Sequence, residues 1–471
     1  MKNSKSLVAG ALVFSGLATL AGSGWVYATT TLVTTMEGLT TCLTTNNSVC
    51  TLGENIAVDG IINILQDTKV SLDLNGYKLY ENENQSLTIT NHGDLTILDS
   101  GTTTGSCDAE IRIMDNGQLE ISNGTFNDVV TANSDNHIGN TSIKISGGIF
   151  NNSVSARDNG SLLNISGGKF NYVNFDGTTA NISDGTFNGY VSIESGTVTI
   201  SKGTFNDAVS LGYTNDKKVS ATISDGTFFG SVRSRSGSSM IINSGTFNGD
   251  VSSHGDDEIN GGDFKGTLFV GDPGSSLVIN GGTFDDVNAI VYEEGSSLKI
   301  TDGKFTKGFA IGLENVSITG GTFYNGTESE GWMALILDHP DTQKYSITGG
   351  TFLNTAEDDG TLMAIKTVTR PTLASIQSLF AGGTVLNGTV IDLDESEDSP
   401  YYWSYIKKQK TNADEADIMV PDTGVITKSS DELKAISGIV VGVMVLFMTS
   451  GSIVFKSRKE LFKKRVNFNK K

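Results

Sequence analysis

A six-residue phrase with alternating apolar and polar positions recurs along the middle of the chain. It reads Ile, then Ser, Thr or Asn, any residue, Gly, any residue and Phe, and its first copy is Ile121–Phe126. Copies follow one another at intervals of roughly 20 residues, which indicates a repeat protein whose units supply the same side chains to a shared core. The twelve copies end at Phe126, Phe150, Phe170, Phe187, Phe205, Phe228, Phe247, Phe264, Phe284, Phe305, Phe323 and Phe352.

Apolar residues alternate with polar ones on both sides of the Phe. Around Phe205, Val198 and Ile200 precede the ring, and Val209 and Leu211 follow it. A period of two predicts strands with one buried face. The Gly of the phrase lies between these strands, where a positive φ lets the chain turn. Because two or three short strands cannot bury their own apolar face, the units are expected to stack.

We therefore predict an all-β fold, a single-stranded parallel β-helix or β-solenoid of about 15 rungs over residues 51–355. Stacking places each Phe above the previous one at about 4.8 Å. Val70–Leu79, Leu87–Ile89 and Leu95–Ile97 are expected to form three irregular rungs before the twelve regular ones. The phrase Leu-Asp-Leu-Asn-Gly at 72–76 resembles the opening of pectate-lyase-like β-helix modules of secreted bacterial surface proteins.

An Asn follows the Phe in half of the copies, where stacked amides are expected to form a ladder along the array. These residues are Asn127, Asn151, Asn171, Asn188, Asn206 and Asn248.

The segments that flank the array are expected to cap its open strand edges. Residues 29–50 are predicted as an N-terminal cap, in which Cys42 and Cys50 can form a disulfide while Cys107 is left over. Residues 356–392 are predicted as a C-terminal cap with a short helix, and 393–424 as a stalk.

The two ends of the chain carry targeting features. Residues 1–28 have basic residues, an apolar stretch and small residues before the end, which predicts a signal peptide cleaved after Ala28. Residues 435–455 are uncharged and long enough to cross a membrane as a helix. The basic tail 456–471 is then cytoplasmic, and the bulk of the chain is extracellular.

A short motif stands before the apolar segment, separated from it by the spacer 425–434. It consists of Val420, Pro421, Asp422, Thr423 and Gly424. Motif, apolar segment and basic tail, in that order, resemble the sorting signal of sortase-anchored (LPxTG-like) surface proteins of Gram-positive-type bacteria, with Val420 in place of the usual Leu. The resemblance implies cleavage between Thr423 and Gly424, with sortase and cell-wall peptidoglycan as partners. A retained single-pass membrane anchor is the alternative.

Composition and charge narrow the choice of partner. The chain has 56 Gly but only 5 Pro, which excludes collagen-like and polyproline structure and suits continuous strand ladders. The net charge of −20 argues against a nucleic-acid partner. Many of the basic residues lie in the two ends, so the exported part is more acidic than the whole chain.

One group of residues is a candidate for polysaccharide chemistry. Asp256 and Asp257 follow His254, and Arg233 and Arg235 belong to the preceding rung. Polygalacturonase-like sites combine several Asp, a His and basic residues, but Asp257 replaces an apolar core residue. A buried carboxylate is costly unless it is paired, so we expect a locally irregular rung that points Asp257 outward.

No other constellation has a catalytic or metal-binding pattern. The four His stand apart in sequence, no calcium loop is present, and no cofactor is expected. We therefore predict a non-enzymatic, cell-wall-anchored surface protein, an adhesin that binds glycans or proteins of a host, a neighbouring cell or a matrix. The alternative is an extracellular polysaccharide lyase or glycoside hydrolase of the pectate-lyase-like superfamily.

Overall fold

The computed structural model describes residues 29–353 with gaps, and four isolated strands at 13–15, 361–367, 390–394 and 402–407. The gaps are 82–85, 133–139, 158–159, 213–216, 290–294, 307–309, 312–314, 325–334 and 338–344. Two compact units are present, Met1–Pro421 and Asp422–Lys471, and all described residues belong to the first. The predicted cleavage site at Ala28, the sorting motif 420–424, the spacer, the apolar segment 435–455 and the basic tail lie outside the described residues.

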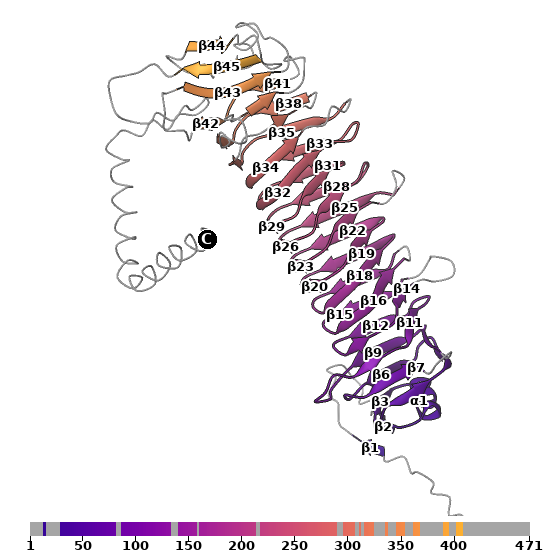
Figure 1. Cartoon of the computed structure of the whole chain (residues 1–471). Helices are drawn as coiled ribbons and strands as arrows, with labels where there is room; N and C mark the ends of the chain where they lie inside the picture. Colours follow the sequence, from indigo (N-terminus) through magenta and orange to yellow (C-terminus); the bar gives the residue numbers. More distant parts are fainter. Residues whose placement is uncertain are drawn as a thin grey trace, which may run out of the picture. The chain divides into compact units, whose positions relative to one another are not determined.

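The described chain is an all-β parallel solenoid of about 13 turns (Figure 1), compared with the 15 expected. Each turn contributes one strand to a 17-stranded sheet, which we call stack one. The sheet extends from β2 and β3 at its N-terminal end to β41 at its C-terminal end, and β1 pairs with β2 in antiparallel orientation. The strands of stack one are β1 Val13–Ser15, β2 Thr29–Val33, β3 Ser48–Leu52, β6 Lys69–Asp73, β9 Asp94–Leu98, β12 Gln118–Ile121, β15 Ser142–Ile145, β17 Leu162–Ile165, β19 Thr178–Ile182, β22 Gly196–Ile200, β25 Val219–Ile223, β28 Ser239–Ile242, β31 Asp256–Ile259, β33 Ser276–Ile279, β35 Ser297–Ile300, β38 Asn315–Ile318 and β41 Tyr345–Ile347.

The rest of each turn forms two further stacks, which together with β44 (Val390–Asp394) and β45 (Tyr402–Lys407) make a 28-stranded sheet. Stack two contains the Phe of each phrase, and stack three contains the apolar pair that follows it. Stack two comprises β4 Ile56–Val58, β7 Lys78–Glu81, β10 Ser106–Cys107, β13 Thr125–Phe126, β20 Thr186–Phe187, β23 Thr204–Phe205, β26 Thr227–Phe228, β29 Thr246–Phe247, β36 Lys304–Phe305, β39 Thr322–Tyr324 and β42 Thr351–Leu353. Stack three comprises β5 Gly60–Ile64, β8 Leu87–Asn91, β11 Glu110–Ile113, β14 Val130–Ala132, β21 Val191–Ile193, β24 Val209–Leu211, β27 Val232–Ser234, β30 Val251–Ser253, β37 Ala310–Ile311, β40 Leu335–Leu337 and β43 Thr361–Thr367. Four longer strands run through both stacks: β16 Ile149–Ala156, β18 Lys169–Phe175, β32 Asp263–Val270 and β34 Thr283–Ala289.

The irregular turns at the N-terminal end differ from the prediction. β6, β7 and β8 pair with β9, β10 and β11 respectively. The segments Val70–Leu79 and Leu87–Ile89 therefore supply three sides of one turn, and Leu95–Ile97 begins the next. The prediction of three separate rungs was wrong because the apolar periodicity of a strand does not say to which side of the coil it belongs.

The core repeats from turn to turn as the sequence period predicts. Leu119 and Ile121 of β12 are buried and pair in register with Ile143 and Ile145 of β15. The Phe rings stack along stack two, with centroids 4.6 Å apart for Phe187 and Phe205. Apolar burial and parallel backbone hydrogen bonds thus act on the same residues in every turn.

A left-handed glycine makes the corner before each Phe. Gly203 has a φ of +136°, and a Cβ atom built on it would lie 3.2 Å from Cε2 of Phe205. The corresponding Gly of all twelve copies has a positive φ, which confirms the role predicted for this position.

The segments beside the solenoid contain regular structure as well. In residues 29–50, α1 (Met36–Leu43) begins at the N-cap Thr35 and buries Leu39 and Leu43, and a disulfide joins Cys42 to Cys50. At the other end, β43 and β44 (Val390–Asp394) pair in antiparallel orientation with β45 (Tyr402–Lys407), a strand within the predicted stalk. Over the part of the chain that the structure describes, no helix has the length and apolar character needed to cross a membrane.

Candidate functional site

The structure does not bring the five residues of the predicted polysaccharide site together. Arg233 and Arg235 are exposed, and so is Asp256, which accepts a hydrogen bond of 2.8 Å from Ser276. Nδ1 of His254 lies 3.2 Å from Oδ1 of Asp272. Asp257 instead lies inside the solenoid, so no shared surface unites the five side chains.

Asp257 is a buried member of the core, and the expectation that it points outward was wrong. Its side chain is 3% exposed and stands in register with Leu277 of the next turn. Oδ2 accepts hydrogen bonds from the hydroxyl groups of Ser234 and Ser253, and Oδ1 accepts one of 2.8 Å from the Met240 amide. The two serines replace apolar residues of stack three, so the carboxyl group is paired within the core rather than expelled from it.

Burial dominates the ionisation of Asp257. It raises the pKa of the carboxyl group, and the hydrogen bonds from Ser234, Ser253 and Met240 only partly oppose this. The group is buried, and its hydrogen bonds hold adjacent turns together. We therefore assign it to the core.

A different set of polar residues gathers on the outside of the solenoid. The residue directly after each stack-three strand forms a column, which we call the corner column. Arg157, Asp176 and Glu194 occupy it in three consecutive turns, each amide bonded to the strand of the turn before. Gly212 follows, and Arg235 and His254 continue the column in later turns. Two of the predicted site residues thus belong to this column, without contacting its first three members in any described interaction.

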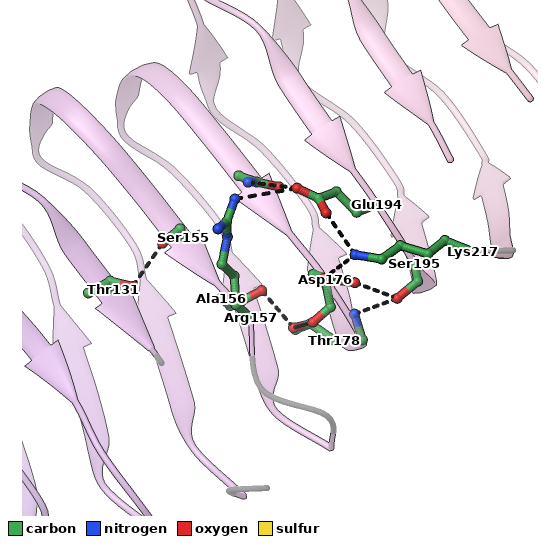
Figure 2. A network of polar contacts seen from close by, with 11 residues as sticks. Thr131, Ser155, Ala156, Arg157, Asp176, Thr178, Glu194, Ser195 and Lys217 are labelled. Atoms are coloured by element: carbon green, nitrogen blue, oxygen red, sulfur yellow. Dashed lines mark hydrogen bonds and ion pairs between the residues drawn. The ribbon is translucent and has the colours of Figure 1, made fainter. Parts of the chain in front are cut away.

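Lys217 joins the two carboxylates of the corner column (Figure 2). Its Nζ atom lies 2.6 Å from Oδ2 of Asp176 and 2.9 Å from Oε2 of Glu194. Nη2 of Arg157 lies 3.3 Å from the other oxygen of Glu194. Ser195 completes the network, since its hydroxyl donates to Asp176 at 2.7 Å and accepts from an amide of the preceding turn at 2.8 Å. Side chains from four consecutive turns therefore form one network with two cations and two anions.

The network favours the ionised forms of Asp176 and Lys217. Burial is the largest influence on Asp176 and raises its pKa, but hydrogen bonds from Lys217 and Ser195 outweigh it, so the pKa ends below its ordinary value. The hydrogen bond to Asp176 likewise raises the pKa of Lys217. At neutral pH the carboxylate and the ammonium group are thus both charged, which suits recognition by hydrogen bonds and charge.

Asn174 extends this network onto the outer face of stack three. It lies in register with Ser155 and Ser192, within the stack-three part of β18, and its Nδ2 donates to Oε1 of Glu194 at 3.2 Å. The side chain is 3% exposed, and its Oδ1 atom is buried without a hydrogen-bond partner among the described residues. A buried acceptor left unsatisfied costs about 1–3 kcal/mol. A ligand that donates a hydrogen bond to this amide oxygen would therefore recover that free energy.

Two aromatic rings flank the same face. Tyr172 and Tyr190 stack across adjacent turns, with centroids 6.3 Å apart and planes inclined by 18°. Tyr172 is 36% exposed. Burial raises its pKa most, and the charges of Arg157 and Glu194 act on it in opposite directions, which places the ring within electrostatic reach of the network. We call Tyr172, Tyr190, Asn174 and the Lys217 network together the outer polar–aromatic site.

Within the described ranges, no three His, Cys, Asp or Glu side chains are grouped so that they could hold a metal ion. Both carboxylates of the network are instead bound to Lys217.

The sequence contained a clue to this site that alignment on Phe conceals. Tyr190 lies three residues after Phe187, whereas Tyr172 lies two residues after Phe170, because β18 is one residue shorter than β16 between the two stacks. Alignment on the stack-three strands would have placed both rings in one column.

Comparisons of this chain with known proteins identify no relative. No protein-family model, curated protein or solved structure gives a significant match to this chain. The function is therefore inferred from the chain's own geometry.

Proposed function

We propose that the protein is a non-enzymatic, surface-displayed binding protein, an adhesin whose solenoid presents the outer polar–aromatic site to ligands of other cells or of a matrix. The observation that supports this most directly is that Lys217 holds both carboxylates of the site, at 2.6 Å and 2.9 Å. Groups fixed in mutual ion pairs are suited to recognition, whereas catalysis needs at least one of them free to exchange a proton.

The ionisation of the network favours binding over glycoside hydrolysis. A glycosidase needs one carboxylic acid that stays protonated near neutral pH, and environments that do this raise the pKa. Asp176 has a lowered pKa instead. A lyase mechanism needs a base that is free to accept a proton, whereas Lys217 has a raised pKa and already donates to both carboxylates.

The polysaccharide-acting enzyme is kept as a second candidate, because the network concentrates charged residues on four consecutive turns, as a catalytic groove would. The two functions are separated by incubating the full chain with a panel of neutral and acidic polysaccharides and measuring reducing ends and unsaturated products. We expect no turnover. Turnover that is lost in both Asp176→Asn and Glu194→Gln, but kept in Asp256→Asn, would establish the enzyme.

Binding is tested on bacteria that display the full chain. We expect these cells to adhere to glycan-coated or protein-coated surfaces more than cells with an empty vector do. Cells that display Asp256→Asn should adhere as well as cells that display the unmodified chain, because this exposed carboxylate contacts Ser276 outside the network. Equal adhesion of displaying and empty cells to every surface would overturn the proposal.

We further propose that sortase joins the carbonyl of Thr423 to cell-wall peptidoglycan, after removal of a signal peptide at Ala28. Support comes from the order of the motif 420–424, the apolar segment 435–455 and the basic tail. A Thr423→Ala variant should be released from wall fragments by hot detergent, whereas the unmodified chain stays attached. Attachment of both chains would contradict sortase anchoring, and release of both would indicate a retained membrane anchor.

A further inference from the structure

A ligand on the side of the solenoid would meet side chains, because neighbouring turns already use each other's backbone groups. Val191 N donates to Ala208 O, and Val209 N to Ser231 O, along the stack that carries the outer polar–aromatic site. A peptide added as an extra strand would therefore lack backbone hydrogen-bond partners on this side of the solenoid. The ligand of this site is therefore one that side-chain rings, amides and charges recognise.

The site offers a flat aromatic surface beside both donors and acceptors. Tyr172 is partly exposed and is backed by the ring of Tyr190. Asn174 and Glu194 supply acceptor oxygens, and the half-exposed Arg157 supplies donors. A pyranose has a matching structure, since one face of its ring is apolar and its hydroxyl groups both donate and accept.

The charges of the network favour a neutral ligand. Arg157 and Lys217 are already paired with Asp176 and Glu194, so an anionic sugar would have to break these pairs to be neutralised. The net charge of −20 also repels polyanions. Uronate chains are thus disfavoured on two independent grounds.

We propose that the outer polar–aromatic site binds a neutral glycan, with one pyranose ring stacked on Tyr172 and its hydroxyl groups bonded to Asn174 and Glu194. The inference rests on the proposed binding function and specifies its ligand. The orphaned Oδ1 of Asn174 gains a hydroxyl donor when the ligand enters. Arg157 has the longest ion pair of the network, 3.3 Å to Glu194, so it is the member of the network that a ligand displaces most easily.

The register of the solenoid supplies variants that preserve the fold. Tyr172→Ser installs the residue that Ser153 provides one turn earlier, and Asn174→Ser installs the residue of both neighbouring turns. Phe269→Ser is the matched control. Phe269 is also 36% exposed, and its register partner is Ser252, but it belongs to β32, several turns away from the site.

The test is calorimetric titration of the full chain in detergent with hexamers of β-1,4-glucose, β-1,4-mannose and β-1,4-galactose, and with α-1,4-galacturonate as the charged comparator. We expect at least one neutral hexamer to bind, with binding weakened by roughly tenfold or more in Tyr172→Ser and Asn174→Ser and unchanged in Phe269→Ser. Galacturonate should bind more weakly than that neutral hexamer.

Three results would overturn the inference: no binding of any neutral hexamer, equal losses in the site variants and in Phe269→Ser, or tighter binding of galacturonate. Adhesion of cells that display the full chain is measured in parallel. Adhesion without binding of a neutral hexamer would leave the proposed function standing and reject only this ligand, whereas absence of adhesion would reject the proposed function itself.

Discussion

The Phe column of stack two and the corner column lie on the same turns but follow opposite rules. Inside, the same residue recurs: Phe187, Phe205 and Phe228 stack with centroids 4.6 Å and 4.7 Å apart and nearly parallel planes. Outside, the corner column changes from Arg157 to Asp176 within one turn. Repetition is required where each turn packs on the next, and variation is allowed where side chains meet solvent or ligand.

The comparison implies that the Phe column stabilises the fold, whereas the corner column determines what the surface binds. A substitution in the Phe column should therefore lower the stability of the fold without changing the surface. A substitution in the corner column should leave the solenoid folded and change only the ionisation of neighbouring groups or ligand binding.

The largest expected effect comes from the Phe column. Phe205→Ala removes a fully buried ring that stacks on both neighbours, and we expect a loss of about 3–5 kcal/mol. Phe229→Ala is the matched control, because Phe229 is 54% exposed and should change stability by less than about 0.5 kcal/mol. Denaturant midpoints from circular dichroism measure both. Similar losses of stability in the two variants would contradict the stabilising role of the Phe column.

The glycine corner should give the next largest effect. Gly203→Ala combines a φ of +136° with a Cβ atom 3.2 Å from Phe205, and we expect a loss of about 1–3 kcal/mol. Gly274→Ala is the milder comparison, since Gly274 has a φ of +78°, nearer the left-handed helical region that other residues can adopt, and no atom within 4 Å of the added Cβ. The control should lose less stability. If Gly274→Ala lost as much, neither the φ of Gly203 nor its contact with the Phe ring would account for the loss.

The buried carboxyl group makes core stability depend on pH. Because burial raises the folded-state pKa of Asp257, the folded chain binds this proton more tightly than the unfolded chain does. Its contribution is therefore most favourable at low pH and is lost as pH rises above the ordinary range of an Asp. Asp257→Asn keeps hydrogen-bonding groups beside Ser234 and Ser253 without titrating.

The measurement is the stability of wild type and Asp257→Asn as a function of pH. We expect the difference between them to shift in favour of the variant as pH rises above about 4. Asp256→Asn is the control, because Asp256 is exposed at the adjacent position. A difference that does not vary with pH would show that Asp257 titrates normally.

The repeating part of the fold could be predicted from the sequence because it rests on a short period. The apolar positions, the positive-φ Gly and the stacking of Phe all follow from one phrase and from strand geometry. The Asn ladder is present in part: Asn151 Nδ2 donates to Asn127 Oδ1 at 2.7 Å, whereas Asn171 donates to a backbone carbonyl.

The candidate site could not be predicted in the same way, because its members share no phrase. Lys217 reaches Asp176 across 41 residues, and the pairing depends on which side chains the coil brings to one corner. Asp257 was misplaced for a related reason. Its partners Ser234 and Ser253 belong to stack three of their turns, and only the closed coil makes these serines face a strand of stack one.

The smallest expected effect on stability concerns the centre of the outer network. Lys217 is 37% exposed, so solvent screens its ion pairs, and Lys217→Met should cost at most about 1 kcal/mol. Its effect on Asp176 is more specific. Without Lys217, burial is less opposed, and the pKa of Asp176 should rise. Because a depressed folded-state pKa stabilises the fold above the unfolded-state pKa, the variant should lose less stability than wild type as acid is added, since less of that stabilisation is present to be lost.

Carboxyl NMR titration of the full chain in detergent measures this pKa directly. Lys69→Met is the matched control: Lys69 lies 2.9 Å from Asp94, but both side chains are well exposed, so its removal should leave Asp176 unchanged. An Asp176 pKa that stays low in Lys217→Met would mean that Ser195 and Arg157 suffice to hold the charge. The network would then not depend on Lys217, and the support that its ion pairs give to binding over catalysis would be lost.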